Sequence, residues 1–213
     1  YLKSKREVHK LSYADGRCEI DSSKLNYFIP LGVTFSHIGM ISSNLKKLIE
    51  AKVTDKSIKE LAPSISLTDL ESVFELLPLE AEKVHYLERR REIEDHVDYE
   101  GDELDLLGLY LDNGFNIGEF EYKDKVPINM LLKSKELDPY FVGSNEGKKV
   151  EKPKLEMSGW WEDILNFIAA RKPQNWIETS FILLNSTKED QEKFIKAFHE
   201  LIKRIHTGKV QKK

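Results

Sequence analysis

The sequence predicts an α+β fold that is mostly helical, with a small two- or three-stranded β element at the N-terminus followed by packed helices. One observation is that turn residues, aromatic residues and β-branched residues gather in the first forty positions. The other is that apolar residues recur every three or four positions from Ser43 onward, which is the spacing of a helix with one buried face.

Composition restricts the class of protein. The chain has 213 residues, of which 40% are hydrophobic and 33% charged, and its net charge is -4. This charge argues against a surface that attracts nucleic acid everywhere. The single cysteine, Cys18, excludes an internal disulfide and a cysteine-rich zinc site. No apolar run reaches the roughly 20 residues of a membrane span, and the charged start does not resemble a signal peptide. We therefore expect a cytoplasmic protein without a membrane partner.

Two strands are predicted near the N-terminus, one from a turn signal and one from its composition. Ala14-Asp15-Gly16 is a turn signal, and the residues from Arg17 to Asp21 alternate as a strand does. The range 26–35, NYFIPLGVTF, has the aromatic and β-branched content of a second strand. Pro30 removes a backbone donor, so this strand is expected at an edge or with a bulge.

Helices are expected in the next hundred residues. A first helix begins near Ser43, a second opens on a capping box at Thr68 and ends at Pro78, a third runs from Leu79 to about Glu94, and a fourth begins at Gly101. Asn113-Gly114 stops the fourth helix. The range 126–132, VPINMLL, is predicted as a short helix. The inward residues of the second, third and fourth helices are predicted to be Leu70, Val73, Phe74 and Leu77; Val84 and Leu87; and Leu104, Leu107, Tyr110 and Leu111.

A polar, glycine-containing stretch predicts the domain boundary. Residues 143–156 read as a linker between a β element plus helical core at 1–142 and a C-terminal helical subdomain at 157–213. The last helix starts at the cap Thr187, with acids in its first turn and bases in its last. Its predicted buried face consists of Phe194, Ala197, Phe198, Leu201, Ile202 and Ile205.

The segment 48–53, LIEAKV, allows two interpretations. As a strand, it places Glu50 and Lys52 on one face, as Mg²⁺-dependent nucleases of the restriction-endonuclease type do, with Asp21 as a second carboxylate. As a helix, it continues the apolar face that begins at Leu45 and consists of strong helix formers. The helix is favoured, because the strand that would lie between Asp21 and this segment, within 26–35, carries no acid. The strand next to Glu50 could then not supply the second carboxylate. Self-contained nuclease activity stays the alternative hypothesis, and Mg²⁺ is a cofactor only under it.

Two further groups are candidate binding residues. Arg89, Arg90 and Arg91 could bind phosphate, or could pair with neighbouring glutamates along an exposed helix face. Trp160 and Trp161 could stack on bases or meet a partner chain, or could fix a helix to the core. The acid-rich range 94–105 lacks the ligand pattern of a calcium loop and is better explained as a helix entrance, so no metal ligands are predicted.

Four phrases carry a resemblance: ISLTDLESVFELL (65–77), VHYLERR (84–90), GDELDLLGLYLDNGF (101–115) and NWIETSFILLN (175–185). Their order and spacing resemble the C-terminal portion of uncharacterised bacterial proteins whose N-terminal half is a restriction-endonuclease-like domain. The resemblance covers about Tyr27 to His199 and carries no catalytic residue. It implies that the chain, which begins at Tyr1 rather than Met, is a fragment whose catalytic residues lie upstream.

The function expected from these features is that of a non-catalytic accessory region. It would belong to a nuclease-associated bacterial protein, of the anti-phage defence type. It would position the catalytic half, a partner subunit or nucleic acid, and an oligomer stays open.

Overall fold

The computed structural model describes residues 8–13, 16–21, 29–36, 45–53, 63–116, 126–129 and 133–207. The chain divides into two compact units, Tyr1–Pro30 and Leu31–Lys213. Residues 143–156, the expected linker, lie inside the second unit.

The first unit contains an antiparallel hairpin of β1 (Val8–Tyr13) and β2 (Gly16–Asp21). Tyr13 pairs with Gly16, and Val8 pairs with Asp21 at the open end. The two strands meet at this pair, which is consistent with the position of the Ala14-Asp15-Gly16 turn signal, although residues 14 and 15 lie outside the described residues. The strand predicted over Arg17–Asp21 is confirmed.

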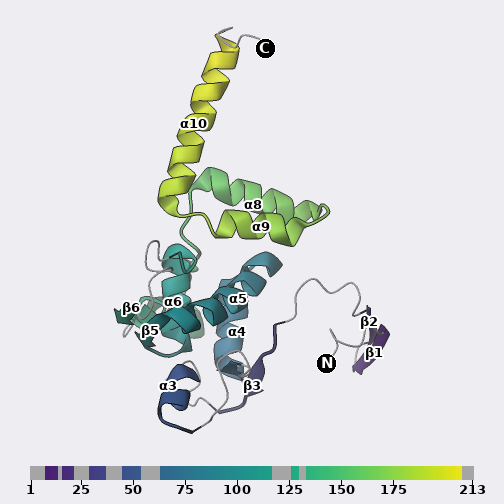
Figure 1. Cartoon of the computed structure of the whole chain (residues 1–213), viewed down its shortest axis with the longest axis vertical. Helices are drawn as coiled ribbons and strands as arrows, with labels where there is room; N and C mark the ends of the chain where they lie inside the picture. Colours follow the sequence, from purple (N-terminus) through teal and green to yellow (C-terminus); the bar gives the residue numbers. More distant parts are fainter. Residues whose placement is uncertain are drawn as a thin grey trace. The chain divides into compact units, whose positions relative to one another are not determined.

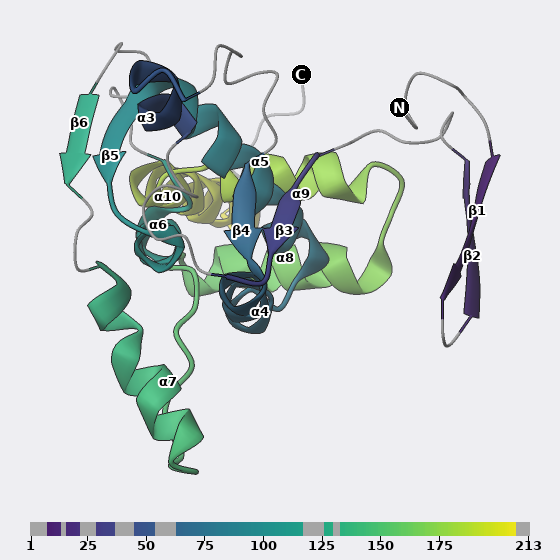
Figure 2. The same ribbon diagram turned by 90° about the horizontal axis from the view of Figure 1, so that it is seen from below.

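The second unit contains two short parallel strand pairs (Figure 2). β3 (Gly32–Thr34) pairs with β4 (Ser64–Ser66), and β5 (Val97–Glu100) pairs with β6 (Val126–Asn129). The strand expected over 26–35 is three residues long in the part of that range which the structure describes. The helix predicted over 126–132 is wrong at 126–129, because these residues pair with β5 over a long sequence separation.

Helices make up most of the second unit, as Figure 1 shows. Their bounds are α3 Leu45–Glu50, α4 Leu67–Leu76, α5 Glu80–His96, α6 Glu103–Asn113, the 3₁₀ helix η4 Lys133–Glu136, α7 Asp138–Asn145, α8 Gly159–Arg171, α9 Trp176–Leu184 and α10 Lys188–His206. The predicted fold class, α+β and mostly helical, is confirmed. Within the described residues, no helix is both long enough and apolar enough to cross a bilayer.

Helix ends follow capping chemistry, with one correction. The capping residue of α4 is Ser66, two residues before the predicted Thr68, and its hydroxyl oxygen accepts the backbone N–H of Asp69 at 3.1 Å. At α6, Asp102 and Asp105 form a reciprocal capping box, and Gly114 ends the helix in the left-handed conformation at φ 65°. The predicted stop at Asn113-Gly114 is confirmed.

The core lies between α4, α5 and α6, with Leu165 from the middle of α8 and Leu184 from the end of α9. Its most deeply buried apolar side chains are Ile65, Val73, Leu76, Leu77, Tyr86, Leu106, Leu107, Tyr110, Phe115 and Leu165. Phe74 was predicted to face inward, but it is about half exposed, so that part of the α4 face is wrong. Leu76 occupies the core instead. Val84, Leu87 and Leu104 are only partly buried.

Candidate functional site

The most prominent surface feature is one side of α10. Thr187 caps this helix by accepting the backbone N–H of Asp190 at 3.1 Å. Glu189 and Asp190 lie in the first turn, and Lys203 and Arg204 lie in the last, an order that suits the helix dipole. The predicted start and charge order of this helix are confirmed. The predicted burial of its apolar face is not.

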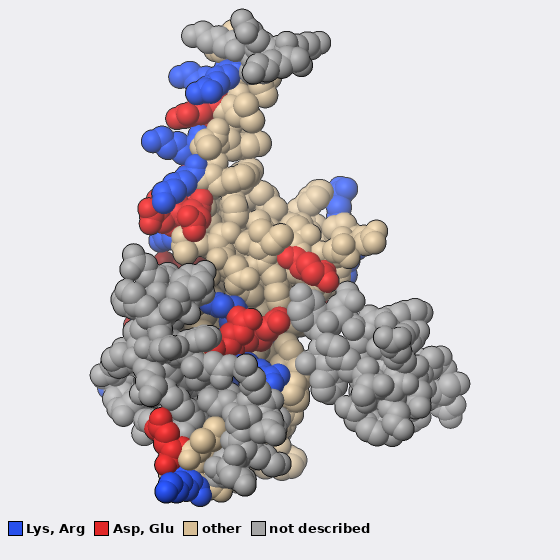
Figure 3. All heavy atoms as spheres, viewed as in Figure 1, with Lys and Arg blue, Asp and Glu red and all other residues tan. Residues whose placement is uncertain are grey.

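The apolar side of α10 is exposed in this chain. Phe194 is 51% exposed, Phe198 36%, Leu201 50% and Ile205 57%. We call these four residues the apolar seam. Figure 3 shows the same contrast on the surface: side chains without charge run along one edge of α10, while Lys and Arg follow the other edge. The prediction of a buried face was wrong because amphipathic spacing does not say which molecule covers the face.

The two neighbouring tryptophans of α8 have different contacts. Trp161 is only 6% exposed and donates its Nε1–H to the carbonyl of Leu183 at 3.0 Å. The ring of Trp160 lies 5.2 Å from that of Phe198 and 5.9 Å from that of Phe194. Trp161 therefore fixes α8 to α9, and Trp160 extends the apolar seam sideways.

Gln191 anchors the first turns of α10 to its own unit. Its Oε1 accepts the backbone N–H of Ser158 at 3.0 Å, and its Nε2 donates to the carbonyl of Ser186 at 3.0 Å. Its side chain is buried. The beginning of the helix is thus held by hydrogen bonds, which fixes the direction in which the seam is presented.

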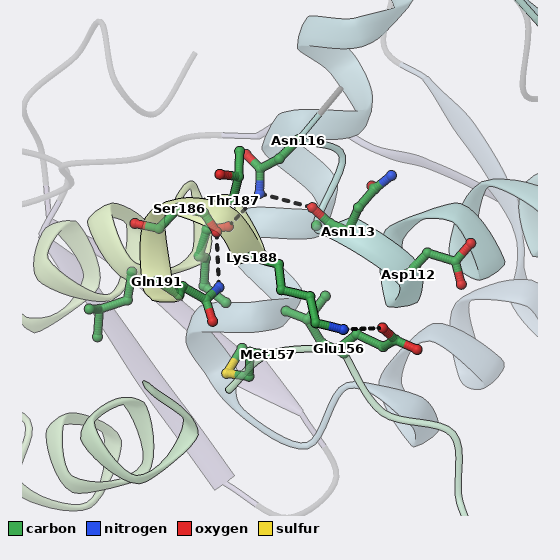
Figure 4. Close-up of a pocket in the computed structure, with 13 residues that line it drawn as sticks. Asp112, Asn113, Asn116, Glu156, Met157, Ser186, Thr187, Lys188 and Gln191 are labelled. Atoms are coloured by element: carbon green, nitrogen blue, oxygen red, sulfur yellow. Dashed lines mark hydrogen bonds and ion pairs between the residues drawn. The ribbon is translucent and has the colours of Figure 1, made fainter. Parts of the chain in front are cut away.

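A small cavity lies beside this anchor (Figure 4), with a volume of about 60 Å³. Asn116 crosses it, donating through Nδ2 to the carbonyls of Asn113 at 2.9 Å and Leu184 at 3.0 Å. Lys188 pairs with Glu156 at 3.3 Å at its rim. Ligand pockets measure roughly 300–1,000 Å³, so this cavity has room for water molecules and not for a substrate.

A buried polar network joins α5, α6 and α9. The Nδ1 atom of His85 lies 3.0 Å from the Tyr110 hydroxyl, and its Nε2 lies 2.9 Å from Oδ1 of Asn185. Since Asn185 presents an acceptor, the neutral ring donates from Nε2 and accepts the tyrosine hydroxyl on Nδ1. Burial lowers the pKa of His85 to about 4 and raises the pKa of Tyr110 well above its ordinary value. This network fixes the helices relative to one another.

The arginine triplet does not form one surface patch. Arg90 is 1% exposed, and its Nη2 lies 2.7 Å from Oε2 of Glu103. The Tyr86 hydroxyl donates to the other carboxylate oxygen of Glu103 at 2.6 Å. Arg89 donates to Glu92 at 2.8 Å and to the carbonyl of Phe115 at 2.8 Å. The sequence suggested either phosphate binding or ion pairs along an exposed helix face. Neither interpretation includes a buried ion pair between two helices, which is what Arg90 and Glu103 form.

The residues of the nuclease hypothesis do not form the strand arrangement it requires. Residues 45–50 are helix α3, so the helical interpretation of LIEAKV is confirmed there. Glu50 is exposed at the end of that helix, and Lys52 lies in the following turn at φ 56°. Asp21 ends strand β2 in the other unit, paired with Val8. The extended segment that would present Glu50 and Lys52 together is absent from residues 48–53.

A metal centre is not indicated by the geometry of the described side chains. Among them, no three His, Cys, Asp or Glu residues come together as a cation site would require. The acid-rich range 94–105 instead supplies strand β5 and the capping box of α6.

His85, Asn185 and Gln191 were missed in the sequence because each is a single polar residue inside a helical pattern. The contacts that explain them join positions as far apart as 100 residues in the sequence. Comparisons with protein families, with curated proteins and with solved structures gave no match to this chain.

Proposed function

We propose that this chain is a non-catalytic interaction region that binds a protein partner through the apolar seam of α10. The observation that carries the proposal is the exposure of Phe194, Phe198, Leu201 and Ile205 on one side of a 19-residue helix. Contiguous apolar surface of this kind, bordered by charged residues, is typical of interaction sites.

The opposite side of α10 strengthens this interpretation. Lys196 and Lys203 lie about half a turn away from the seam and are exposed. A helix with one apolar and one charged side gains free energy when only the apolar side is covered, at about 25 cal/mol per Å² of apolar surface removed from water. This pattern favours a partner that contacts one side of the helix.

The way in which α10 is attached to the rest of its unit also suits a role in binding a partner. Its first turns are held by Thr187 and Gln191, so the seam is presented from a fixed base. A preorganised surface loses less conformational entropy on binding than a flexible one. The helix therefore supports binding without first having to fold.

The resemblance to nuclease-associated bacterial proteins indicates which partners to consider. On that basis, we propose that the interaction region belongs to a cytoplasmic defence-type protein and positions a catalytic half or a partner subunit. The burial of Arg90 disfavours nucleic acid as the ligand of the arginine triplet, because a core ion pair cannot contact phosphate without opening the fold.

A photo-crosslinking experiment tests the proposal. Benzoylphenylalanine is placed at Ala197, beside the seam, and in a matched control at Lys196, on the opposite side; both positions are exposed. The chain is made at its natural level in the organism from which it comes. We expect a discrete protein adduct from position 197 that disappears when Leu201→Asp is added.

The control position decides how an adduct is interpreted. Equal adducts from positions 196 and 197 would mean random collisions, and no adduct from position 197 would mean an uncovered seam. Either result would contradict the proposal.

A further inference from the structure

The only Asn-Gly pair of the sequence, Asn113-Gly114, lies at the C-terminal end of α6. Asparagine followed by glycine loses its side-chain amide more readily than other asparagines do, because glycine has no Cβ to shield its backbone nitrogen. In this reaction the glycine nitrogen attacks the side-chain carbonyl carbon of the asparagine. The end of α6 therefore contains both reactants of a spontaneous modification.

The reaction needs no co-reactant except water. The Gly114 nitrogen loses its proton and forms a bond to Cγ of Asn113, the Cγ–Nδ2 bond breaks, and ammonia leaves. Water then opens the resulting five-membered imide at either of its two carbonyl carbons. The products are an aspartate at position 113 or an isoaspartate, in which the backbone continues through the side-chain carbon.

The folded end of α6 holds both reactants in an unreactive state. The Gly114 N–H donates to the carbonyl of Tyr110 at 2.6 Å, so the proton that must leave is in a hydrogen bond to a group that is not a base. The Oδ1 atom of Asn113 is shielded from solvent and accepts no hydrogen bond from any described residue. Negative charge develops on this oxygen during the attack, and here no donor would stabilise it.

Asn116 connects this helix end to α9. Its Nδ2 donates to the carbonyl of Asn113 at 2.9 Å and to the carbonyl of Leu184, the last residue of α9, at 3.0 Å. Figure 4 shows the Asn116 amide turned toward the Asn113 carbonyl. The Gly114 nitrogen is released only when the last turn of α6 opens, and that opening has to break these bonds as well.

We propose that Asn113 is a site of spontaneous deamidation, and that the chain is modified there only after the end of α6 has opened. Refolding does not reverse the change. A carboxylate at position 113 lies next to Asp112 at the C-terminus of the helix, where negative charge is unfavourable. An isoaspartate adds one carbon to the backbone just before Gly114, which moves its N–H away from the Tyr110 carbonyl. The modified chain therefore loses the stop of α6.

Peptide mapping by mass spectrometry tests this inference. The full chain is incubated at mildly alkaline pH in buffer and in urea, and the conversion of Asn113 to its acid is followed over time. We expect the wild type to react at least about tenfold more slowly in buffer than in urea, because the open state is a minor population.

The variant Asn116→Ala tests whether the end of α6 provides the protection. It keeps the Asn-Gly pair and removes two hydrogen bonds, so in buffer it should deamidate about tenfold faster than the wild type, and in urea equally fast. Asn166→Ala, at an exposed position of α8, is the matched control and should leave both rates unchanged. Circular dichroism verifies that both variants keep their helix content.

Three results would overturn the inference. Equal wild-type rates in buffer and in urea would show that the fold does not protect Asn113, and this comparison depends on no variant. An Asn113 that stays unmodified in urea would show that the pair is not reactive. A folded Asn116→Ala variant that reacts in buffer no faster than Asn166→Ala would show that the protection does not come from the end of α6.

Discussion

The hydroxyl oxygen of Tyr110 lies 3.0 Å from Nδ1 of His85, and both side chains are completely buried. The ring accepts this hydroxyl only while Nδ1 carries no proton. Protonation would therefore place a charge in the core and turn an acceptor into a donor. The consequence is a dependence of stability on pH.

We expect the free energy of unfolding to fall as the pH drops from about 6.5 to 4. Burial lowers the pKa of His85 from 6.5 to about 4 in the folded state, so the unfolded chain binds more protons in this window. The contribution is fully present above pH 6.5, and up to about 3 kcal/mol is lost by pH 4, at 1.36 kcal/mol per pKa unit. Urea titrations at several pH values measure it.

The variant His85→Gln isolates this contribution. This variant should be less stable than the wild type at pH 7. Its free energy of unfolding should lack the part of the pH dependence that comes from His85. The difference in stability between wild type and variant should therefore become smaller as the pH drops. Burial raises the pKa of Glu82 and gives the opposite slope, which both proteins share. A difference that does not change with pH would contradict the prediction.

Replacing Glu103 by alanine should destabilise the fold by roughly 3–5 kcal/mol, because it leaves the buried Arg90 guanidinium without its carboxylate. Tyr86 loses an acceptor at the same time. Chemical denaturation measures the loss. The matched control is Glu136→Ala, which removes an exposed ion pair with Lys133 and should cost less than about 1 kcal/mol. Equal effects of the two variants would show that burial does not matter here.

The variant Gly114→Ala should cost about 2 kcal/mol of stability. Gly114 adopts φ 65°, and a Cβ there would lie 3.1 Å from both the Leu184 carbonyl oxygen and the Asn116 amide nitrogen. Gly147→Ala is the control, because Gly147 has φ 71° but an added Cβ meets only open space. That variant should cost about 1 kcal/mol, from backbone strain alone. Thermal unfolding of the two variants therefore separates crowding from strain.

Lys52→Gly should raise stability by about 0.5 kcal/mol, because Lys52 has φ 56° in the turn after α3, a conformation that glycine adopts without strain. Its N–H donates to the carbonyl of Ile49 at 3.0 Å, and glycine keeps that bond. Glu50→Ala, in the exposed neighbouring position, should change stability by less than about 0.5 kcal/mol. A loss above 1 kcal/mol for Lys52→Gly would mean that its side chain has a structural role.

Local chemistry was predictable wherever one short stretch decides the conformation. The Asn113-Gly114 stop, the Thr187 cap and the strand over Arg17–Asp21 were predicted from their residues alone. In each case the deciding signal lies in residues that are consecutive or nearly so in the sequence. Residues 126–129 were predicted wrongly, because their strand exists only through pairing with Val97–Glu100.

For the candidate site, the sequence by itself determined that α10 has an apolar side and an ordered set of charges. Helical periodicity and end charges are properties of consecutive residues. Only the tertiary structure decided that Arg90 turns into the core and that the apolar seam is exposed among the described residues of its unit. Burial is a relation between segments far apart in the sequence or on different molecules, and no local pattern contains it.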